Sequence, residues 1–235
     1  MISLSGRVAL VTGGSSGSEL AKAFLESGSN VAFIYRNKAR EAKIKETFER
    51  FGASFLPVKA DLSDSAEARQ SVTSIHDKFG GIDFLLNSLG GWMGGKKLHE
   101  HSLSELQEMF SMDMIPTFNI MSAVLPIMME QKCGKIINFI SMQVFGSGVN
   151  NSVYSASKSA VLALTKASAE EYKNFGISFY AMAPSTIDTE NNRRSMPKAD
   201  TSKWVKIQEI VDAALFLCGA GDSSNGTIIK FPGKL

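Results

Sequence analysis

The sequence predicts an α/β protein built on a doubly wound parallel sheet of about seven strands, with helices on both faces. Short apolar runs rich in β-branched residues recur along the chain, and longer segments with helical periodicity separate them. Strands that alternate with helices favour a parallel sheet covered on both sides. Because no linker rich in Pro, Gly or Ser interrupts the pattern, we expect residues 1–235 to form a single domain.

The expected elements alternate from one end of the chain to the other. Buried strands are predicted from their apolar runs at 7–12, 30–35, 54–60, 82–87, 134–140, 176–182 and 226–231. Helices are predicted from their periodicity at about 17–28, 38–51, 64–79, 102–131, 151–174 and 207–218.

Composition limits the classes of function. The formal charge of +2 is near balance and the basic residues are dispersed, so neither a nucleic-acid nor a membrane partner is expected. Cys133 and Cys218 lie far apart without metal-like spacing, and the three histidines form no ligand motif. The chain begins without a signal-peptide pattern, and no stretch approaches the roughly 20 apolar residues of a membrane span. We therefore expect a cytoplasmic protein that acts on a small molecule and holds no metal.

A glycine-rich turn follows the first predicted strand. Gly13, Gly14, Ser15, Ser16 and Gly17 lie where that strand passes into a helix. Glycines at such a turn let backbone amides approach a pyrophosphate, which the helix N-terminus also attracts. The turn is a candidate dinucleotide site, although a tight turn that serves packing only has the same pattern.

Basic residues follow the second predicted strand. Arg36 lies nineteen residues after Gly17, with Asn37 beside it. A carboxylate near this position would bind the ribose hydroxyls of NADH, whereas an arginine fits the 2′-phosphate of NADPH. NADPH is therefore favoured over NADH, unless Arg36 is only the solvated start of a helix. Asp61, which ends the third strand, fits either the adenine amino group or the cap of the next helix.

A serine, a tyrosine and a lysine form the sharpest chemical pattern. Ser141 follows the fifth predicted strand, and Tyr154 and Lys158 lie four residues apart in a predicted helix. Residues four apart share a helix face, so the Lys158 charge is expected to lower the pKa of the Tyr154 phenol. Tyr154 is then a candidate proton donor, and Ser141 a candidate to orient the substrate.

With these motifs in place, the whole chain resembles the short-chain dehydrogenase/reductase family, which has a Rossmann-type fold. TGGSSG at 12–17 is similar to the family's cofactor turn, NSLG at 87–90 to its strand end, and YSASK at 154–158 to its catalytic helix. The resemblance implies that Asn87 and Gly90 line the cofactor cleft. It also implies that Tyr154 is the acid/base and that Lys158 binds the nicotinamide ribose.

Further implications concern the end of the cleft and the assembly. APSTIDT at 183–189 resembles the family's segment beside the nicotinamide, which assigns Pro184 and Thr186 to the cofactor site. The apolar helix at 102–131 and the Tyr154 helix commonly form subunit contacts in this family. The resemblance therefore implies a homodimer or homotetramer.

Three positions depart from the family pattern. Glu19 stands where the last glycine of the cofactor turn is usual, Asp113 replaces an asparagine that is the fourth catalytic residue, and Ser185 replaces a glycine. A glutamate beside a pyrophosphate site puts the cofactor turn in question. The aspartate means that the family's asparagine-based proton relay cannot be transferred to this chain.

Two segments resemble dihydropteridine reductases. These segments are GGWMGG at 90–95 and TIDTENNRRSMPKADTSKW at 186–204. Trp92 would then be an aromatic wall for a flat pterin ring, although it fits equally a side chain that plugs the loop against the core. Trp204 is expected to anchor the loop after Pro184.

The first functional hypothesis from the sequence is thus an NAD(P)H-dependent reductase, for which a quinonoid dihydropterin is the leading candidate substrate. An alternative is a carbonyl reductase, such as one that acts on 3-oxoacyl-[acyl-carrier-protein]. A third reading is a non-catalytic dinucleotide-binding sensor or scaffold, which Glu19 and Asp113 favour.

Overall fold

One parallel sheet of seven strands is present in the computed structural model, which describes residues 3–146 and 148–234. The strand order is β3-β2-β1-β4-β5-β6-β9, and every neighbouring pair runs parallel. The strands of this sheet are β1 (Val8–Thr12), β2 (Asn30–Tyr35), β3 (Phe55–Lys59), β4 (Phe84–Asn87), β5 (Gly134–Phe139), β6 (Ile177–Pro184) and β9 (Ile228–Phe231).

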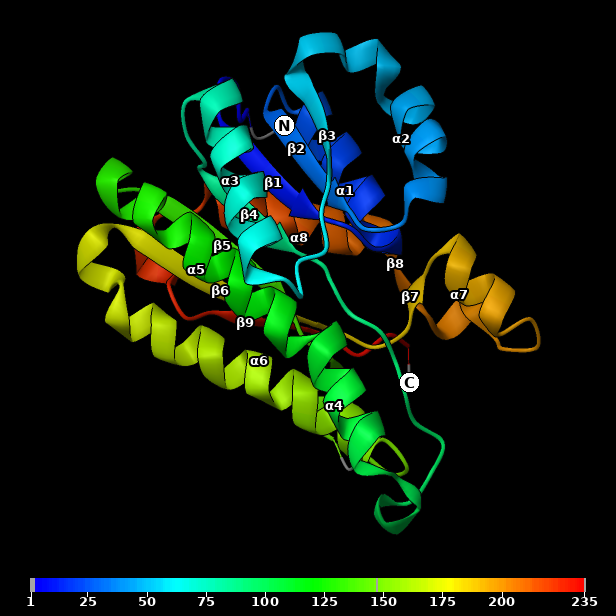
Figure 1. Cartoon of the computed structure of the whole chain (residues 1–235). Helices are drawn as coiled ribbons and strands as arrows, with labels where there is room; N and C mark the ends of the chain where they lie inside the picture. Colours follow the sequence, from blue (N-terminus) through cyan, green and yellow to red (C-terminus); the bar gives the residue numbers. More distant parts are fainter. Residues whose placement is uncertain (1–2, 147, 235) are drawn as a thin grey trace.

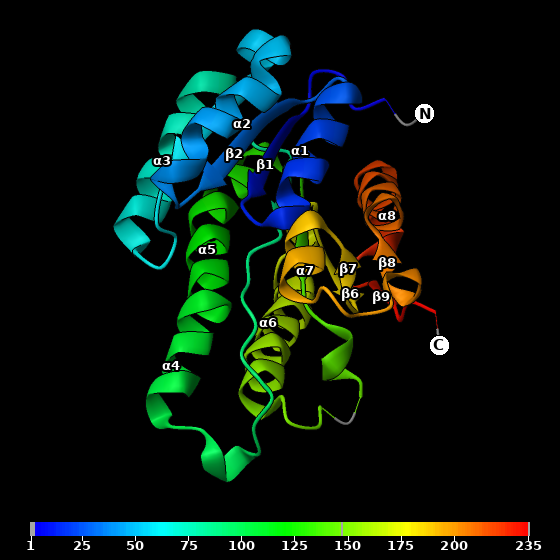
Figure 2. The same cartoon turned by 90° about the vertical axis from the view of Figure 1, so that its right-hand side faces the viewer.

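Helices cover both faces of this sheet (Figures 1 and 2). They are α1 (Ser15–Glu26), α2 (Glu41–Phe48), α3 (Ser65–Phe79), α4 (Leu103–Met112), α5 (Met114–Gln131), α6 (Ser152–Glu171), α7 (Glu190–Ser195) and α8 (Ile207–Gly219). In Figure 1, α3, α5 and α6 lie in front of the sheet, and α1 and α8 lie behind it. The doubly wound fold expected from the sequence is confirmed.

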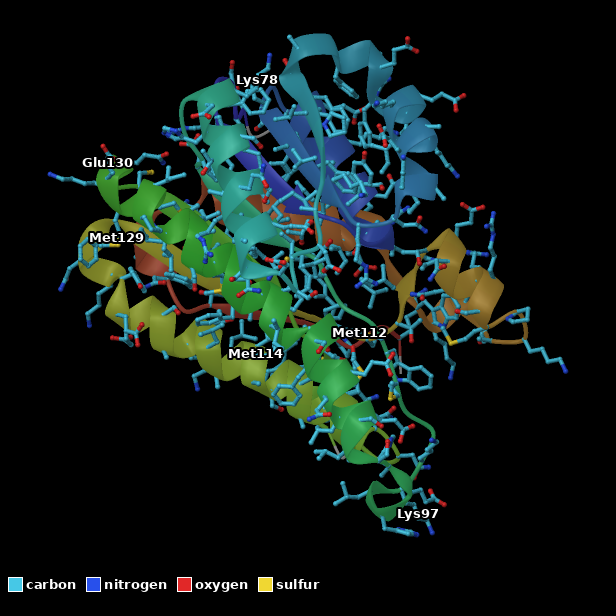
Figure 3. All side chains as sticks on the ribbon, viewed as in Figure 1. Lys78, Lys97, Met112, Met114, Met129 and Glu130 are labelled. Carbon is cyan, nitrogen blue, oxygen red and sulfur yellow. The ribbon has the colours of Figure 1, made fainter. Side chains whose placement is uncertain are left out.

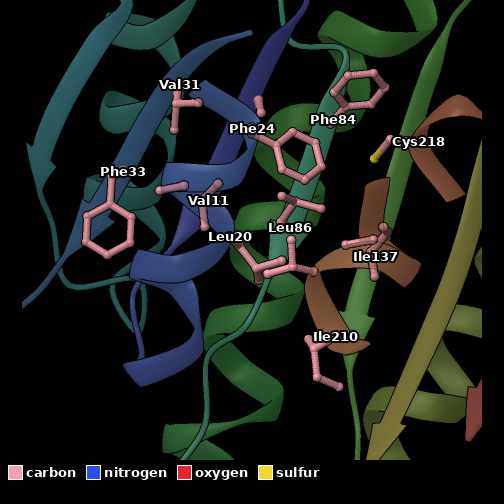
Figure 4. Close-up of a cluster of buried hydrophobic side chains, with 14 of the residues drawn as sticks. Val11, Leu20, Phe24, Val31, Phe33, Phe84, Leu86, Ile137, Ile210 and Cys218 are labelled. Atoms are coloured by element: carbon pink, nitrogen blue, oxygen red, sulfur yellow. The ribbon is translucent and has the colours of Figure 1, made fainter. Parts of the chain in front are cut away.

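The core is divided by the sheet because successive strand residues point to opposite faces. In β1, Ala9 and Val11 join the apolar cluster beneath α1 and α8, whereas Leu10 joins the cluster beneath α3 and α5. Figure 4 shows part of the first cluster, where Phe24 and Phe84 meet edge to face with ring centroids 6.0 Å apart. Both faces of the sheet are therefore buried, as expected for strands that are apolar along their whole length.

The strand order reverses between β1 and β4, which fixes the place of the site. Successive crossovers leave β1 toward β3 on one side and toward β9 on the other. In open parallel sheets, a crevice forms at this point outside the carboxyl ends of the strands. The glycine turn after β1 and the loop after β4 both begin at that edge.

Two of the predicted helices, 38–51 and 102–131, are divided in the structure. The segment 38–51 forms a short 3₁₀ turn (Lys38–Arg40), then α2, then a second 3₁₀ segment (Glu49–Ser54). The segment 102–131 is divided at Asp113, which separates α4 from α5.

A two-stranded parallel pair, β7 (Ile187–Asp188) with β8 (Val205–Lys206), was not predicted. It closes the segment that carries α7, at the right of Figure 1. Trp204, directly before β8, is buried at 9% exposure, and its role as an anchor of the loop stays a prediction. The remaining short 3₁₀ segments are Leu98–Glu100, Met142–Val144, Lys173–Phe175, Thr201–Lys203 and Asp222–Ser224.

One stretch, Leu103–Gln131, is long and apolar enough to cross a bilayer by length and composition. The expectation that no such stretch exists is therefore wrong. Half of its most apolar window is buried inside the protein, and α5 within it packs against α3 and the sheet. Its apolar character is that of a core helix.

Candidate active site

The glycine turn after β1 packs closely against neighbouring backbone. A Cβ on Gly17 would lie 2.6 Å from the Thr12 carbonyl oxygen, and one on Gly14 would lie 2.8 Å from the Ser88 carbonyl oxygen. Gly14 is the N-cap of α1, with φ of 148°, and no side chain caps the helix. The first amides of α1 therefore remain available to a phosphate, which favours the predicted dinucleotide site.

Of the two predicted serines in the turn, only Ser16 has a side chain that the structure describes. Ser16 is buried in the first turn of α1. The side chain of Ser15 lies outside the part of the chain that the structure describes. A hollow of about 660 Å³ opens beside this turn and is lined by Gly14 and Ser18, together with residues of α2 and α7.

Glu19 does not crowd the turn. Its side chain is exposed and lines the hollow beside α2 and α7, while the close approach of helix to strand occurs at Gly17. The departure from the family pattern at position 19 therefore adds an acidic side chain to the wall of the hollow. It leaves the packing of α1 on β1 intact.

A second hollow of about 310 Å³ shares the lining residues Gly14, Arg40 and Gly90 with the first. Arg36, Asn37 and Asp61 line it, as expected for residues that bind the adenosine end of a dinucleotide. Burial opposes the ionisation of Asp61, but donation from Ser63 and the Arg36 charge outweigh it and lower the pKa of Asp61. The hollow thus holds a carboxylate beside an arginine.

Asp61 does not cap the next helix. Its carboxylate accepts hydrogen bonds from the Ser63 amide and hydroxyl, at 3.0 and 2.7 Å. The N-cap of α3 is Asp64, which accepts from the amides of Ala66 and Glu67. The alternative interpretation of Asp61 as a helix cap is wrong, because Asp64 already occupies that position.

Asn87 lies beneath the cleft. It is 1% exposed, accepts a hydrogen bond from Thr12 Oγ1 at 3.0 Å, and donates to Thr117 Oγ1 at 2.9 Å and to Asn138 Oδ1 at 3.2 Å. All of these partners are protein groups, and Asn87 is not among the residues that line the two hollows. Its side chain therefore connects three strands and α5.

Ser141, Tyr154 and Lys158 come together at the carboxyl end of β5. Ser141 lies two residues beyond the last residue of that strand and accepts a hydrogen bond from the Gln143 amide at 3.2 Å. Its hydroxyl lies near enough to the Tyr154 side chain to lower the pKa of that phenol. Tyr154 and Lys158 share one face of α6, as their spacing predicts.

Lys158 is 4% exposed and fully occupied with partners. Its ammonium donates to the carbonyl oxygens of Leu89 and Phe139, both at 3.2 Å, and lies 3.5 Å from Asp113 Oδ1. Burial lowers the pKa of Lys158, and the Asp113 carboxylate opposes that effect. The ammonium is thus held by one anion and two carbonyls.

The pKa of Tyr154 is raised. Burial is the main cause, the Ser141 hydrogen bond opposes it, and the Asp113 charge adds to it. The expectation that Lys158 brings about a net lowering of this pKa is wrong for the structure, because burial and the negative charge of Asp113 act in the opposite direction. Tyr154 is therefore held as a protonated phenol.

Gly90 gives the loop after β4 its close approach to these groups. A Cβ at Gly90 would lie 2.6 Å from Lys158 Nζ and 2.8 Å from Asp113 Oδ1. Gly90 also lines both hollows. The loop continues as an arm past the α4–α5 junction, between the Met112 and Lys97 labels of Figure 3.

Trp92 lies on this arm with 66% of its surface exposed. Its indole Nε1 donates to Asn151 Oδ1 at 3.1 Å, at the residue that precedes α6. The interpretation of Trp92 as a plug against the core is wrong, because the ring is largely in solvent. The ring is also absent from the walls of the two hollows.

The segment after β6 forms another wall. Asp188 and Thr189 line the larger hollow, whereas Pro184 and Thr186 are not among its lining residues. Pro184 pairs with Phe231 at the end of β6, and the Thr186 carbonyl accepts from the Val205 amide at 2.9 Å. Pro184 and Thr186 therefore set the course of the backbone that brings Asp188 and Thr189 to the hollow.

The comparisons with known proteins agree with this geometry. The family model described as short chain dehydrogenase matches residues 7–200. The chain belongs to this family.

Characterised members of the short-chain dehydrogenase family resemble the chain over nearly its full length. The 2-(R)-hydroxypropyl-CoM dehydrogenase of Xanthobacter autotrophicus is 31% identical over 228 residues, which cover 91% of each protein. A gluconate 5-dehydrogenase of Burkholderia cenocepacia, solved in complex with NADP and tartrate, superimposes with a TM-score of 0.87 at 28% identity. That comparison covers 99% of this chain and 96% of the solved one. As a short-chain dehydrogenase, the protein is an oxidoreductase.

Sequence reasoning missed two features of the site. Ser88 Oγ donates to the Thr12 carbonyl at 3.0 Å and so fixes the glycine turn. Asp113 pairs with Lys158, although the two residues lie 45 positions apart in the sequence. The apolar residues around Asp113 gave a signal, since a charge in an apolar helix requires a buried partner.

Replacement of Gly90 by Ala is expected to lower the free energy of unfolding, because the new methyl group would meet Lys158 and Asp113. The matched control is Gly95→Ala in the same loop, which also has a positive φ but has no atom within 4 Å of an added Cβ. Overpacking should make the loss at Gly90 larger by about 1–3 kcal/mol. Urea denaturation measures both losses, and equal losses would contradict the crowding at Gly90.

Proposed function

We propose that this oxidoreductase uses NADPH to reduce a small carbonyl compound. The observation that carries the proposal is the placement of Ser141 after β5, beside the α6 helix that carries Tyr154 and the buried Lys158, whose ammonium donates to the Phe139 carbonyl at the end of β5. Two hydroxyl donors that converge at one place suit a carbonyl oxygen, which gains negative charge as it is reduced. The hydroxypropyl and gluconate dehydrogenases named above support this substrate class.

Each of the three residues has a defined part in the proposed reaction. Bound nicotinamide dinucleotide supplies the hydride that the carbonyl carbon accepts. Ser141 donates a hydrogen bond to the carbonyl oxygen, and Tyr154 transfers its phenol proton to the same oxygen, which gives an alcohol. Lys158 stabilises the tyrosinate that remains, until solvent returns the proton to it.

The dinucleotide would occupy the two neighbouring hollows. Gly13, Ser15, Ser16 and Gly17 would hold the pyrophosphate, whereas Arg36, Asn37 and Asp61 would hold the adenosine end. Near Lys158 the reactive end would meet the loop at Gly90 and the segment after Pro184, which includes Thr186. Asn87 would support the site indirectly, because its hydrogen bonds to Thr12 and Thr117 hold the edge of the sheet in place.

We also propose a homodimer or homotetramer in the cytoplasm. Ile115 and Phe118 of α5 are 40% and 51% exposed, although both are apolar. The family resemblance implies subunit contacts on this helix and on α6. Burial of these side chains against a second copy would remove apolar surface from water.

Replacement of Tyr154 by Phe is expected to lower kcat for reduction by about 10²- to 10⁴-fold, because the substrate oxygen loses its proton donor. The Kd for the dinucleotide should change little. Steady-state kinetics and fluorescence titration measure the two quantities. Tyr172→Phe, near the other end of the α6 helix, is the matched control and should keep full turnover. Turnover that persists in the Tyr154 variant would refute its role as proton donor.

Arg36→Asp should exchange the cofactor preference. Loss of a charged hydrogen bond to the 2′-phosphate costs about 1.5–3 kcal/mol, so kcat/KM with NADPH should fall by about 10- to 100-fold. The value with NADH should stay constant or rise. Arg69→Asp on the exposed face of α3 changes the net charge equally and is the control. An unchanged NADPH to NADH ratio in the Arg36 variant would rule out this cofactor assignment.

A quinonoid dihydropterin is a second candidate substrate. It takes second place because Trp92, the expected aromatic wall, does not line the two hollows. The exposure of Trp92 and its hydrogen bond to Asn151, directly before the Tyr154 helix, still favour a flat aromatic ligand near that helix. The alternative of a dinucleotide sensor predicts binding without turnover of any substrate.

The two substrates can be separated at Trp92. If the indole stacks on a pterin, Trp92→Ala should raise the KM for quinonoid dihydropterin by about 3- to 10-fold and leave the KM for a 3-oxoacyl thioester unchanged. Loss of reduced nicotinamide absorbance gives both rates. Phe216→Ala, an exposed aromatic on α8, is the control. Equal effects on both substrates would remove the support that Trp92 gives to a pterin.

A further inference from the structure

The helix that carries Tyr154 begins without a side-chain cap. Asn151 is the N-cap residue of α6, but its Oδ1 accepts from Trp92 Nε1 at 3.1 Å and its Nδ2 donates to the Val149 carbonyl at 2.9 Å. Within the described part of the chain, no group accepts from the amides of residues 152–154. Three donors at the positive end of a 20-residue helix therefore stay available to an anion.

Two buried hydroxyls in this part of α6 also lack a partner. The Oγ atoms of Ser152 and Ser155 are buried and form no hydrogen bond among the residues that the structure describes. The two serines lie three residues apart on one face, and helical Cβ atoms tilt toward the N-terminus. A Cβ on Gly148 would lie 2.8 Å from Ser155 Oγ, so the glycine leaves room beside that hydroxyl. Because an unpaired hydroxyl in the interior is costly, these oxygens indicate a hydrogen-bonding ligand.

The arm that follows β4 runs alongside this turn (Figures 1 and 2). Lys96 of the arm forms a parallel bridge with Asn151, next to the hydrogen bond from Trp92. These contacts hold the exposed indole of Trp92 beside the start of α6. The turn thus combines donors for an anion with an apolar ring that can cover the rest of a ligand.

The charges around the turn leave an anion unopposed by its own segment. Residues 144–157 include no Asp, Glu, Lys or Arg. Lys96 is already paired with Glu105, at 2.6 Å, so the arm offers no free charge at that position. Ser152 and Tyr154 are the first and third residues of α6, about 3 Å apart along the helix axis. An anion at the turn and a carbonyl at Tyr154 can therefore belong to one small molecule.

We propose that the first turn of α6 is a carboxylate subsite and that the carbonyl substrate is a small oxo acid. The amides of residues 152–154 and the Ser152 hydroxyl donate to the carboxylate, and Trp92 covers the carbon chain from the arm. This assignment rests on the proposed reductase function, because Tyr154 acts on the same molecule. The subsite itself can be measured without turnover.

Oxo acids and their methyl esters test the subsite in the full-length protein. With saturating NADPH, kcat/KM for 3-oxobutanoate or 4-oxopentanoate should exceed that for the methyl ester by about 10- to 100-fold, because a charged acceptor strengthens each hydrogen bond. Loss of reduced nicotinamide absorbance gives the rates. Equal or higher values for the esters would overturn the proposal.

Asn151→Asp places a negative charge at the turn and keeps a residue type that helices favour as N-cap. It should lower kcat/KM for 4-oxopentanoate by about 5- to 30-fold and change the value for the methyl ester little. Asn174→Asp, an exposed position beyond the other end of α6, changes the net charge equally and is the control. An equal fall with acid and ester, or no fall with the acid, would overturn the proposal. Should Asn151→Asp fail to fold, the comparison of acid with ester in the wild type still decides.

Ser152→Ala tests the buried hydroxyl. The KM for 4-oxopentanoate should rise by about 3- to 10-fold and that for the methyl ester should stay constant, because only the carboxylate accepts from this hydroxyl. Ser159→Ala, an exposed position of the same helix, is the matched control. A merely structural serine would lower the melting temperature and affect both substrates equally, and that result would contradict the subsite.

Binding of a compound that cannot be reduced separates this inference from the proposed function. Titration calorimetry of the protein saturated with NADP⁺ should show that pentanoate binds at least about 10-fold more tightly than pentanamide, and that Asn151→Asp removes the difference. Such binding without turnover of any oxo acid would refute the reductase proposal alone. Equal turnover of acids and esters, with no preference for pentanoate, would refute the carboxylate subsite alone.

Discussion

The buried pair of Lys158 and Asp113 is the constraint on which the site depends. A lysine in the interior needs an anion, and that anion needs further donors, so the pair recruits the Gly91 amide and the Ser157 hydroxyl. The break between α4 and α5 and the absence of a side chain at Gly90 both make room for it. Loop, junction and helix are therefore positioned together.

The sheet supplies the remaining alignment. Parallel strands bring the ends of β1, β4 and β5 to one edge of the sheet. The glycine turn, the Gly90 loop and Ser141 therefore converge, although they are far apart in the sequence. Asn87 strengthens this edge from below through its bonds to Thr12 and Asn138. The polar network is fully paired, which is the condition for a buried network to rigidify a site.

Patterns within short segments of the sequence predicted the features that depend on neighbouring residues alone. The apolar runs yielded the seven strands, and the spacing of Tyr154 and Lys158 yielded their common face. The division of 102–131 at Asp113, the small β7–β8 pair and the raised pKa of Tyr154 depend on contacts between distant segments. The sequence showed an aspartate at position 113, but it did not show that Lys158 is the partner of that carboxylate.

The uncapped start of α1 has a thermodynamic consequence. With glycine as its N-cap, α1 forgoes roughly a few tenths of a kcal/mol relative to a side-chain cap, and Gly14 lines a hollow. A ligand that binds the folded state alone restores stability by mass action, about 2.7 kcal/mol at 100 times its Kd. The resistance of this protein to unfolding would then follow the ratio of dinucleotide concentration to Kd, so that its lifetime in a cell is coupled to the supply of its own cofactor.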